Sequence, residues 1–505
     1  MKPTLVLFAA TTIAAWAQAP NKCAQLGQFK SPGLTLEITR AEMVAPGQAT
    51  GRGGAPTGPV LPAHCRVNGT IDKRTGPDGK LYGIKFAIAM PDNWSSQYLQ
   101  QGGGGLNGTV AEPTGTQFTG TQPAIVRGFA VATTDTGHVA AGGGGFDGSF
   151  MQDQQAALDF EYIANGRVAV LAKQIIETYY AKPIAHSYFI GCSTGGREAM
   201  LMTQRYPLYF DGVVAGAPAM RTGHSNLATK SVTVALNSVG GLTDPDRQAI
   251  ITKLADTCDA RDGIKDGMIF DVTGCNFTPA SLQCTGAKAD GCLSAAQAAA
   301  LTKAFAGPKD SRGNQVYPGF FFDTGITATG GGIPGLIATG TSPLGAPTKA
   351  TTQDIDAEAR TVDSNPVSRI GDSYSWTNLS SFSAHGGKLL FVHGVSDPWF
   401  SAKDTIDYYQ RMSTANGGEA KVRDWSRLFL SPGMGHCGGG SATLDTFDLL
   451  TSAVNWVEKG TAPDAVTATG RAFPNRSRPL CAYPAHAQYK GTGDPESAAS
   501  FDCKQ

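Results

Sequence analysis

A serine set between glycines, at the junction of an apolar run and a helical pattern, constrains this chain more than any other feature. Residues 188–190 are apolar, Gly191-Cys192-Ser193-Thr194-Gly195 follows, and residues 196–202 continue as a helix-forming sequence. A G-x-S-x-G motif between a strand and a helix forms a sharp turn that presents the serine hydroxyl to a cleft. The glycines let backbone segments pack closely around that turn. The motif predicts that Ser193 is a nucleophile.

The sequence around this turn alternates strand-like and helix-like patterns. Strand patterns cover residues 82–90, 129–134, 187–190, 211–218, 388–394 and 427–430, and helix patterns cover residues 168–180 and 446–458. Such alternation predicts a largely parallel sheet with helices on both faces. Together with the serine turn, it predicts the α/β class and an α/β-hydrolase fold.

The alternation breaks down between residues 221 and 376. Four cysteines cluster from Cys258 to Cys292, and residues 324–352 are rich in Gly, Thr and Pro. The simplest interpretation is a catalytic hydrolase domain over residues 18–220 and 377–505, interrupted by an inserted lid domain at 221–376.

The first residues have the pattern of an export signal. Met1-Lys2 precedes an apolar run at residues 5–15, and Ala15-Trp16-Ala17 fits a small-x-small cleavage site, so residues 1–17 are predicted to be a signal peptide. No other segment approaches the ~20 apolar residues that a membrane span needs. We therefore expect a secreted or periplasmic protein without a membrane anchor.

Charge balance limits the classes of partner. Lys and Arg total 41, as do Asp and Glu. The chain therefore has no excess of positive charge that would attract nucleic acid or an anionic membrane. A neutral or weakly polar small substrate is expected.

Two further residues complete a candidate catalytic triad. Of the eight histidines, His436 alone follows a strand-like run near the C-terminus within a glycine-rich loop, and Asp397 directly follows the strand pattern at 388–394. The order Ser193, Asp397, His436 is that of α/β-hydrolases. The alternatives are a hydrogen-bonded loop histidine at 436 and an Asx turn at 397 before Pro398.

Oxyanion stabilisation requires two backbone N–H donors near the nucleophile. One is expected from Thr194, and the other from the glycine run at residues 102–105. A flexible turn is the alternative interpretation of that run. A phosphate-binding loop is disfavoured because no G-K-[ST] follows.

All ten cysteines lie beyond residue 17. An even number in an exported chain favours five disulfides, whose connectivity the sequence does not fix. Cys192 and Cys437 each adjoin a predicted triad member, so we expect them to bridge and to tie the serine turn to the histidine loop. Two separate buried thiols are the alternative, and zinc is disfavoured because no CxxC pair occurs.

A loop of alternating carboxylates and glycines follows Cys258. Asp259, Asp262 and Asp266, with the carbonyl oxygens of Ile264 and Met268, offer the oxygen ligands that Ca²⁺ prefers. The spacing is not that of an EF-hand. A solvated turn is the alternative.

These motifs together resemble the tannase and feruloyl esterase family, which includes feruloyl esterases, tannases and mono(2-hydroxyethyl) terephthalate hydrolases. The resemblance covers nearly the whole chain after the signal segment. It is carried by the motifs at residues 191–197, 393–397, 435–437 and 259–268. It implies a secreted serine carboxylesterase that hydrolyses feruloyl, hydroxycinnamoyl or galloyl-type aromatic esters, including esters derived from plant polymers, through an acyl-enzyme without an organic cofactor.

Carried over by position, the resemblance implies further roles. The oxyanion hole would be formed at Gly105 and Thr194, Phe400 would line the acyl pocket, and the residues of the acidic loop would bind a structural calcium in the lid. The implied disulfides are Cys23–Cys65, Cys192–Cys437, Cys258–Cys275, Cys284–Cys292 and Cys481–Cys503.

The chain departs from the terephthalate-monoester hydrolases in its lid. The segment from Tyr317 to Trp376 is shorter, and Thr194 replaces the acidic residue that follows the nucleophile in those enzymes. Arg360 and Arg369 are the candidate replacements for their carboxylate-binding arginine. Three alternatives to the feruloyl- or galloyl-type esterase remain: a terephthalate-monoester hydrolase, a peptidase, and a non-catalytic exported ligand-binding protein on a hydrolase fold.

Overall fold

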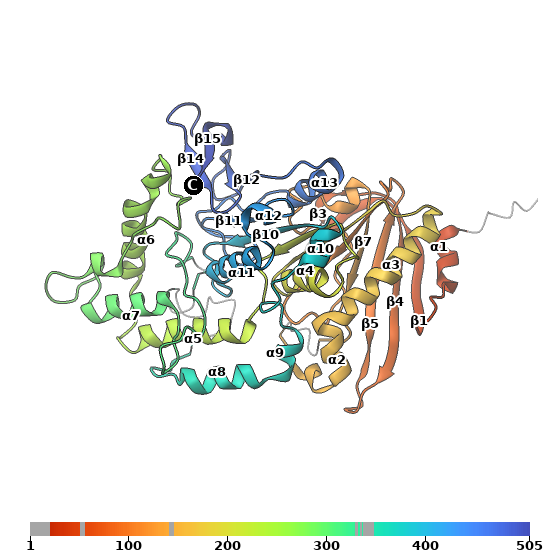
Figure 1. The fold of residues 1–505 in the computed structure, drawn as a ribbon, viewed down its shortest axis with the longest axis horizontal. Helices are drawn as coiled ribbons and strands as arrows, with labels where there is room; N and C mark the ends of the chain where they lie inside the picture. The colour runs from red at the N-terminus through yellow and green to blue at the C-terminus, as the bar shows by residue number, and fades with distance from the viewer. Residues whose placement is uncertain (1–20, 51–55, 141–145, 329–331, 334–335, 337–347) are drawn as a thin grey trace, which may run out of the picture.

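The computed structural model describes residues 21–50, 56–140, 146–328, 332–333, 336 and 348–505 (Figure 1). The predicted signal segment 1–17 lies outside the described residues. At the centre is a nine-stranded sheet in the order β1-β4-β5-β7-β6-β8-β9-β10-β11. Its strands are β1 (Leu36–Val44), β4 (His64–Thr75), β5 (Leu81–Pro91), β6 (Gln97–Gln101), β7 (Phe129–Thr134), β8 (His186–Cys192), β9 (Gly212–Gly216), β10 (Lys388–Gly394) and β11 (Ser426–Ser431).

The sheet is mixed rather than wholly parallel. From β7 through β11, neighbouring strands pair in parallel, as the βα alternation predicts, whereas β1, β4, β5 and β7 pair antiparallel. Only residues 76–80 separate β4 from β5. Since a parallel crossover needs about a dozen residues, this connection allows only a hairpin.

Apolar side chains project from both faces of the parallel strands, and helices cover each face. Phe189 and Phe391 pack on the face covered by α3 (Ala164–Tyr180), α4 (Thr194–Arg205) and α11 (Ala402–Ala415). Tyr188, Ile190 and Val392 pack on the opposite face, in one cluster with Leu450 and Trp456 of α13 (Leu449–Lys459). Adjacent strand residues point to opposite faces, which explains why these strands are apolar throughout.

The C-terminal residues form two small hairpin-like sheets that extend this second cluster. One pairs β12 (Ala465–Thr469) with β13 (Ser477–Cys481), and the other pairs β14 (His486–Tyr489) with β15 (Phe501–Lys504). Other short elements are α1 (Lys22–Gln25), α2 (Gln154–Leu158), α12 (Glu419–Val422), β2 (Gly47–Thr50) and β3 (Pro56–Leu61). Helix α13 begins three residues later than the predicted 446, because the Asp448 side chain caps it by accepting from the Thr451 N–H at 2.8 Å.

Between β9 and β10 the described chain adds no strand to the central sheet. It forms α5 (Thr222–Asn237), α6 (Asp244–Cys258), α7 (Ala295–Ala306), α8 (Ile355–Ser364), α9 (Pro366–Ile370) and α10 (Ser380–Ala384). Helices α6 and α7 each begin with a capping box, at Thr243/Asp246 and Ser294/Gln297. Leu254, Leu301 and Phe305 belong to an apolar cluster within this insertion, whose green helices lie to the left of the sheet in Figure 1. The boundaries at residues 221 and 376 stay predictions.

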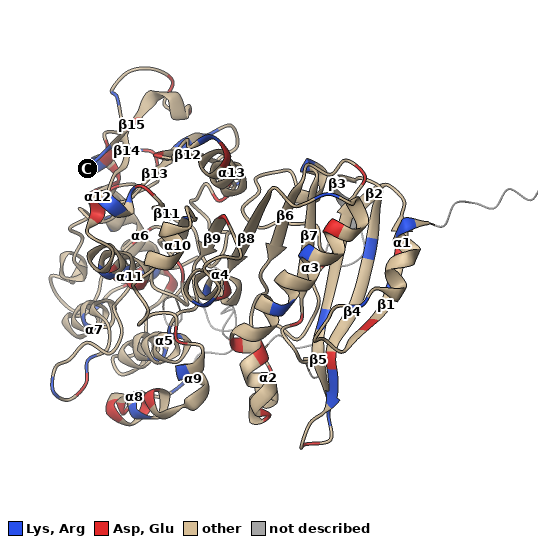
Figure 2. Ribbon diagram, turned by 45° about the vertical axis from the view of Figure 1, so that its right-hand side comes forward, with Lys and Arg blue, Asp and Glu red and all other residues tan. Residues whose placement is uncertain are grey.

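Five disulfides link the ten cysteines, with the pairing that the resemblance implies. None of the described helices is long and apolar enough to span a bilayer. Basic and acidic residues are interspersed along the helices and strands (Figure 2).

Candidate active site

Ser193 occupies a tight turn between β8 and α4. Its backbone has φ 65° and ψ −122°, a conformation that is costly for a residue other than glycine. The turn is held because the Ser193 N–H donates to the Gly216 carbonyl at 3.0 Å. A Cβ on Gly191 would overlap the Gly195 carbonyl, and a Cβ on Gly196 would overlap the Gly216 carbonyl. Glycine is therefore required at both positions for the serine to be presented in this way.

Asp397 and His436 come together at the carboxyl ends of β10 and β11. The Nδ1 atom of His436 lies 2.7 Å from Oδ2 of Asp397. The other carboxylate oxygen accepts from the N–H groups of Trp399 (2.8 Å) and Phe400 (3.0 Å). Asp397 thus forms an Asx-type turn with one oxygen and holds the histidine with the other, so the two interpretations of this residue are compatible.

Asp397 is 1% exposed. Burial alone would raise the pKa of its carboxyl. The charge and hydrogen bond of His436, helped by His393 at 3.4 Å from Oδ2, instead hold that pKa well below its usual range. Asp397 is therefore an anion at neutral pH, which fixes the proton of His436 on Nδ1 and leaves Nε2 as the basic nitrogen.

The Cys192–Cys437 disulfide joins the serine turn to the histidine loop. Its Cα atoms are 5.9 Å apart, and each half-cystine is adjacent to Ser193 or His436. His436 Nε2 is buried and has no hydrogen-bond partner among the described residues, so the bond to Ser193 Oγ is not formed in this structure. Hydrogen bonds of this kind are often long in substrate-free enzymes and shorten when substrate binds.

Thr194 and Gly105 lie together beside Ser193, on the wall of one cleft. Thr194 is the first residue of α4, so its N–H has no acceptor within the helix. The Gly105 N–H has no acceptor among the described residues, and Gly105 has φ 57°. The Thr194 hydroxyl donates to the Gly105 carbonyl, which holds the two segments against each other.

A buried acid to which no sequence motif points anchors the glycine-rich loop. Glu198 accepts from the Gly103 N–H at 2.9 Å and from the Asn107 amide at 2.8 Å. Burial raises the pKa of Glu198, and the Gly103 N–H opposes this shift. The one sequence signal is an acidic residue in the first turns of the helix that follows the nucleophile.

The cleft beside Ser193 has a volume of about 840 Å³, within the range of small-molecule sites. Phe400 and Trp399 form part of its wall and stack with ring centres 5.3 Å apart, and the Phe400 ring lies 5.3 Å from that of His436. Phe400 thus lines the cleft beside Ser193, and its contact with an acyl group stays a prediction. The insertion contributes Arg369 to the lining, whereas Arg360 is not among the lining residues.

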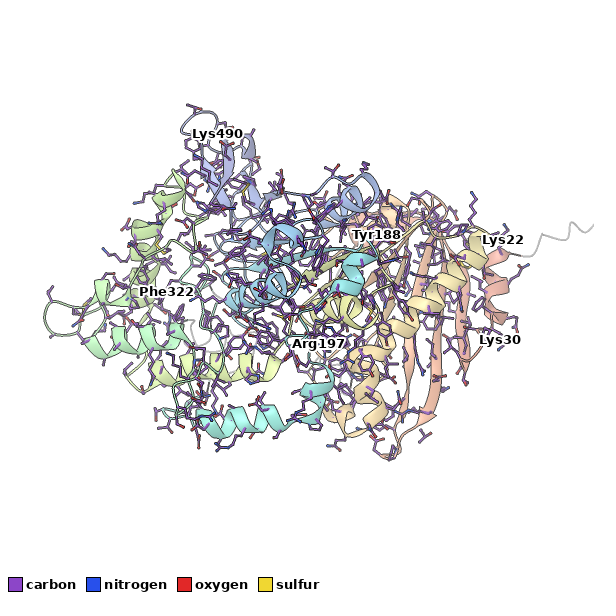
Figure 3. All side chains as sticks on the ribbon, viewed as in Figure 1. Lys22, Lys30, Tyr188, Arg197, Phe322 and Lys490 are labelled. Carbon is purple, nitrogen blue, oxygen red and sulfur yellow. A yellow bond between two sulfur atoms is a disulfide. The ribbon has the colours of Figure 1, made fainter. Side chains whose placement is uncertain are left out.

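Arg197 lines the same cleft near the middle of the molecule (Figure 3). Its guanidinium pairs with Glu161 and lies 4.8 Å from the centre of the Phe160 ring. Burial lowers the pKa of Arg197 to about 10. The cleft therefore combines aromatic walls with a few charged groups.

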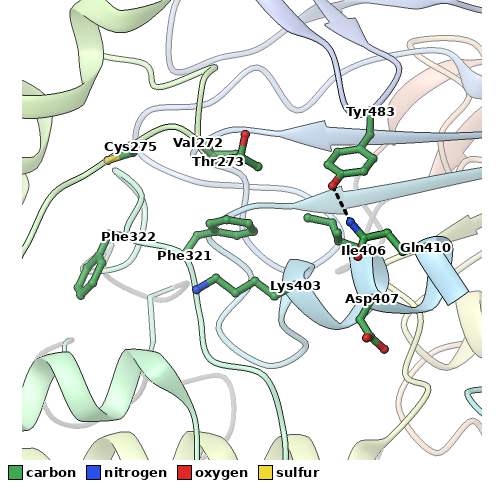
Figure 4. A pocket seen from close by; sticks show the side chains of 10 residues that line it. All are labelled: Val272, Thr273, Cys275, Phe321, Phe322, Lys403, Ile406, Asp407, Gln410 and Tyr483. Atoms are coloured by element: carbon green, nitrogen blue, oxygen red, sulfur yellow. Dashed lines mark hydrogen bonds between the residues drawn. The ribbon is translucent and has the colours of Figure 1, made fainter. Parts of the chain in front are cut away.

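A second cavity of about 420 Å³ lies elsewhere, between the insertion and α11 (Figure 4). Phe321, Lys403 and Tyr483 are among its lining residues. None of Ser193, Asp397 and His436 lines it, so it is not the reaction site.

In the acidic loop, Asp259 accepts from the N–H groups of Asp266 (3.1 Å) and Gly267 (2.8 Å), and Asp262 accepts from Phe270 (3.2 Å). Asp266 pairs with Arg478 at 2.5 Å. Among the described residues, no group of three or more His, Cys, Asp or Glu side chains has a metal-binding arrangement.

The oxygen atoms of this loop are of the kind that a hard cation prefers, and calcium binding stays a prediction. Burial, together with repulsion from Asp266 and Asp259, raises the pKa of Asp262 to about 7. The carbonyl oxygens of Ile264 and Met268 accept no hydrogen bond from the described residues. Nearby carboxylates and free carbonyls are ligands that Ca²⁺ prefers.

Comparison with known proteins identifies the family. The family model for tannase and feruloyl esterase matches residues 65–354 and 348–504. The mono(2-hydroxyethyl) terephthalate hydrolase of Piscinibacter sakaiensis is 35% identical, over 88% of this chain and 85% of that protein. A probable feruloyl esterase of Arthroderma benhamiae is 30% identical, over 87% of this chain and 85% of that protein.

Solved structures agree on the fold. Feruloyl esterase B from Aspergillus oryzae superposes with a TM-score of 0.77 at 24% identity, covering 96% of this chain and 99% of that one. Tannin acyl hydrolase from Aspergillus niger has a TM-score of 0.68 at 20% identity, covering 94% and 90%. The chain therefore belongs to the tannase and feruloyl esterase family, as a carboxylic ester hydrolase built on the α/β-hydrolase fold.

Proposed function

We propose that this chain hydrolyses aromatic carboxylic esters through an acyl-enzyme on Ser193. The observation that carries the proposal is the 2.7 Å contact between His436 Nδ1 and the buried Asp397 carboxylate, tied by a disulfide to the serine turn. His436 Nε2 accepts the proton of Ser193 Oγ as that oxygen attacks the ester carbonyl carbon. The same proton then passes to the leaving alcohol, and water releases the acid in a second cycle of the same steps.

Negative charge develops on the carbonyl oxygen during both steps. The N–H groups of Thr194 and Gly105 are the proposed donors to that oxygen, because neither has a competing acceptor. Each such donor contributes roughly 100- to 1000-fold in rate. Asp397 stabilises the imidazolium that forms on His436 and keeps its ring oriented.

The aromatic preference follows from the wall formed by Trp399 and Phe400 beside His436. Two relatives are named for feruloyl and terephthalate esters. A feruloyl- or galloyl-type acyl group is the first candidate substrate. The test is a panel of methyl ferulate, methyl gallate, a terephthalate monoester and a short aliphatic ester. The highest kcat/KM on the aliphatic ester would refute the aromatic preference.

A terephthalate monoester is the second candidate. Arg369 lines the cleft and offers a guanidinium to a free carboxylate. Arg369→Ala should raise KM for the terephthalate monoester and leave methyl ferulate unaffected. An equal effect on both substrates would remove this candidate.

We further propose that the chain is exported and that the acidic loop binds Ca²⁺. Residues 1–17 fit a cleaved signal, and five disulfides suit an oxidising compartment. N-terminal sequencing of the mature protein tests the cleavage after Ala17.

Calcium would be held by Asp259, Asp262, Asp266 and the carbonyls of Ile264 and Met268, and would stabilise the insertion without entering the chemistry. A chelator should lower the melting temperature of the unmodified chain but not that of Asp262→Asn. An unchanged melting temperature and no bound metal would leave a simple turn.

A further inference from the structure

One buried carboxyl of the insertion contacts both loops that carry the acid and the base of the proposed triad. Asp323 has no exposed surface. Its Oδ2 atom accepts from the Ser396 hydroxyl at 2.6 Å and from the Gly433 N–H at 2.7 Å. Ser396 directly precedes Asp397, and Gly433 lies three residues before His436.

The chain next to Asp323 fits closely against the same two loops. The Gly325 N–H donates to the Ser396 hydroxyl at 3.0 Å. A Cβ on Gly325 would lie 2.6 Å from the Gly433 carbonyl oxygen. The two loops are also joined directly, since the Ser396 N–H donates to the Met434 carbonyl at 3.0 Å. Asp323 is thus the side chain at which the insertion, the acid loop and the base loop meet.

We propose that Asp323 is a positioning residue, which fixes the acid loop relative to the base loop and so makes the insertion part of the catalytic framework. This inference rests on the proposed function of Ser193, Asp397 and His436. Without the Asp323 carboxyl, the Gly433 N–H loses its partner in a dry interior, which is costly. The histidine loop must then move to restore a partner. A misplacement of about 1 Å in a reacting group costs on the order of 100-fold in rate.

The protonation state and hydrogen bonds of Asp323 decide which substitutions test its role. Burial raises its pKa, while the hydrogen bonds from Ser396 and Gly433 oppose this shift. Its Oδ1 atom has no partner among the described residues. Asparagine retains an acceptor oxygen for both donors, so Asp323→Asn preserves the positioning bonds that Asp323→Ala removes.

Asp246 supplies a matched control. It is also an unexposed aspartate of the insertion, and it also accepts from backbone N–H groups, at Thr243 (3.1 Å) and Gly291 (3.2 Å). It bonds to neither catalytic loop. Loss of its carboxyl should destabilise the insertion without moving Asp397 or His436.

The experiment measures kcat and KM on methyl ferulate for the unmodified chain and four variants. We expect Asp323→Ala to lower kcat about 10- to 100-fold with KM within about twofold. Asp323→Asn should stay within about threefold, and Asp246→Ala should lower the melting temperature while keeping kcat. Ser396→Ala removes the bond to Asp323, and with it the bond that the Gly325 N–H donates to the same hydroxyl, with little change in volume. This variant should lower kcat even if Asp323→Ala does not fold.

Proton NMR gives a readout independent of turnover. The proton between His436 Nδ1 and Asp397 should shift or broaden in Asp323→Ala and Ser396→Ala, but not in Asp246→Ala. The proposal is overturned if kcat and this resonance are unchanged in folded Asp323→Ala or Ser396→Ala, or if Asp246→Ala reproduces their losses. A failure of the proposed function appears instead in the unmodified chain, as absent turnover or turnover that survives Ser193→Ala.

Discussion

The disulfide between the serine turn and the histidine loop should affect both stability and catalysis. Cys192 and Cys437 are 245 residues apart, whereas Cys284 and Cys292 in the insertion are 8 apart. In the chain-entropy account, cross-linking removes more freedom from the unfolded chain when the closed loop is longer. Removing the first bridge should cost about 5.5 kcal/mol and removing the second about 2.5 kcal/mol.

The two disulfides should differ more clearly in their effect on kcat than in their effect on stability. The Cys192–Cys437 bond holds the neighbours of Ser193 and His436 together, with Cα atoms 5.9 Å apart. Its loss lets the nucleophile and the base drift, so we expect kcat to fall at least about tenfold. The Cys284–Cys292 bond contacts neither residue, so its loss should leave kcat unchanged.

The assay compares the double variants Cys192→Ser/Cys437→Ser and Cys284→Ser/Cys292→Ser. Guanidinium unfolding gives stability, and hydrolysis of a chromogenic cinnamate ester gives kcat under conditions where both variants are folded. Wild-type kcat in a folded Cys192→Ser/Cys437→Ser variant would refute the idea that this bridge pre-organises the triad.

Three further predictions follow from the geometry. A Cβ on Gly195 would lie 2.7 Å from the Gly103 carbonyl oxygen, so Gly195→Ala should displace the proposed oxyanion loop and lower kcat about 100-fold; unchanged kcat would argue against that loop as a donor. Burial lowers the pKa of His138 from 6.5 to about 4, so the unfolded chain binds this proton more tightly. In urea unfolding, His138 should leave the free energy of unfolding unchanged above pH 6.5 and lower it by about 3 kcal/mol near pH 4. The variant His138→Asn should lack this loss of stability at low pH. Phe400→Ala should raise KM for methyl ferulate about tenfold more than for an aliphatic ester, and equal effects would exclude a specific aromatic contact.

The sequence predicts the parallel half of the sheet and the candidate triad for a common reason. Both depend on local patterns: apolar strands buried on two faces, and short loops directly after strands β8, β10 and β11. The serine turn is the clearest case, because its glycines are dictated by contacts that any such turn must make.

The features that the sequence does not reveal depend on contacts between distant segments. Asp323 lies 110 residues before Gly433 and 73 before Ser396, in a stretch without a recognisable motif. Glu198 reaches a loop 95 residues earlier in the chain. The antiparallel edge formed by β1, β4 and β5 includes the β4–β5 hairpin, which the alternating pattern did not include.

Covalent labelling of Ser193 is the most direct test of the account. The chain is mixed with an activated cinnamate ester, quenched in acid during the first turnovers and digested for peptide mass spectrometry. We predict a cinnamoyl adduct on Ser193, together with an initial burst of alcohol release that His436→Ala removes. Turnover without any adduct, or with the adduct on another residue, would contradict the proposed acyl-enzyme mechanism.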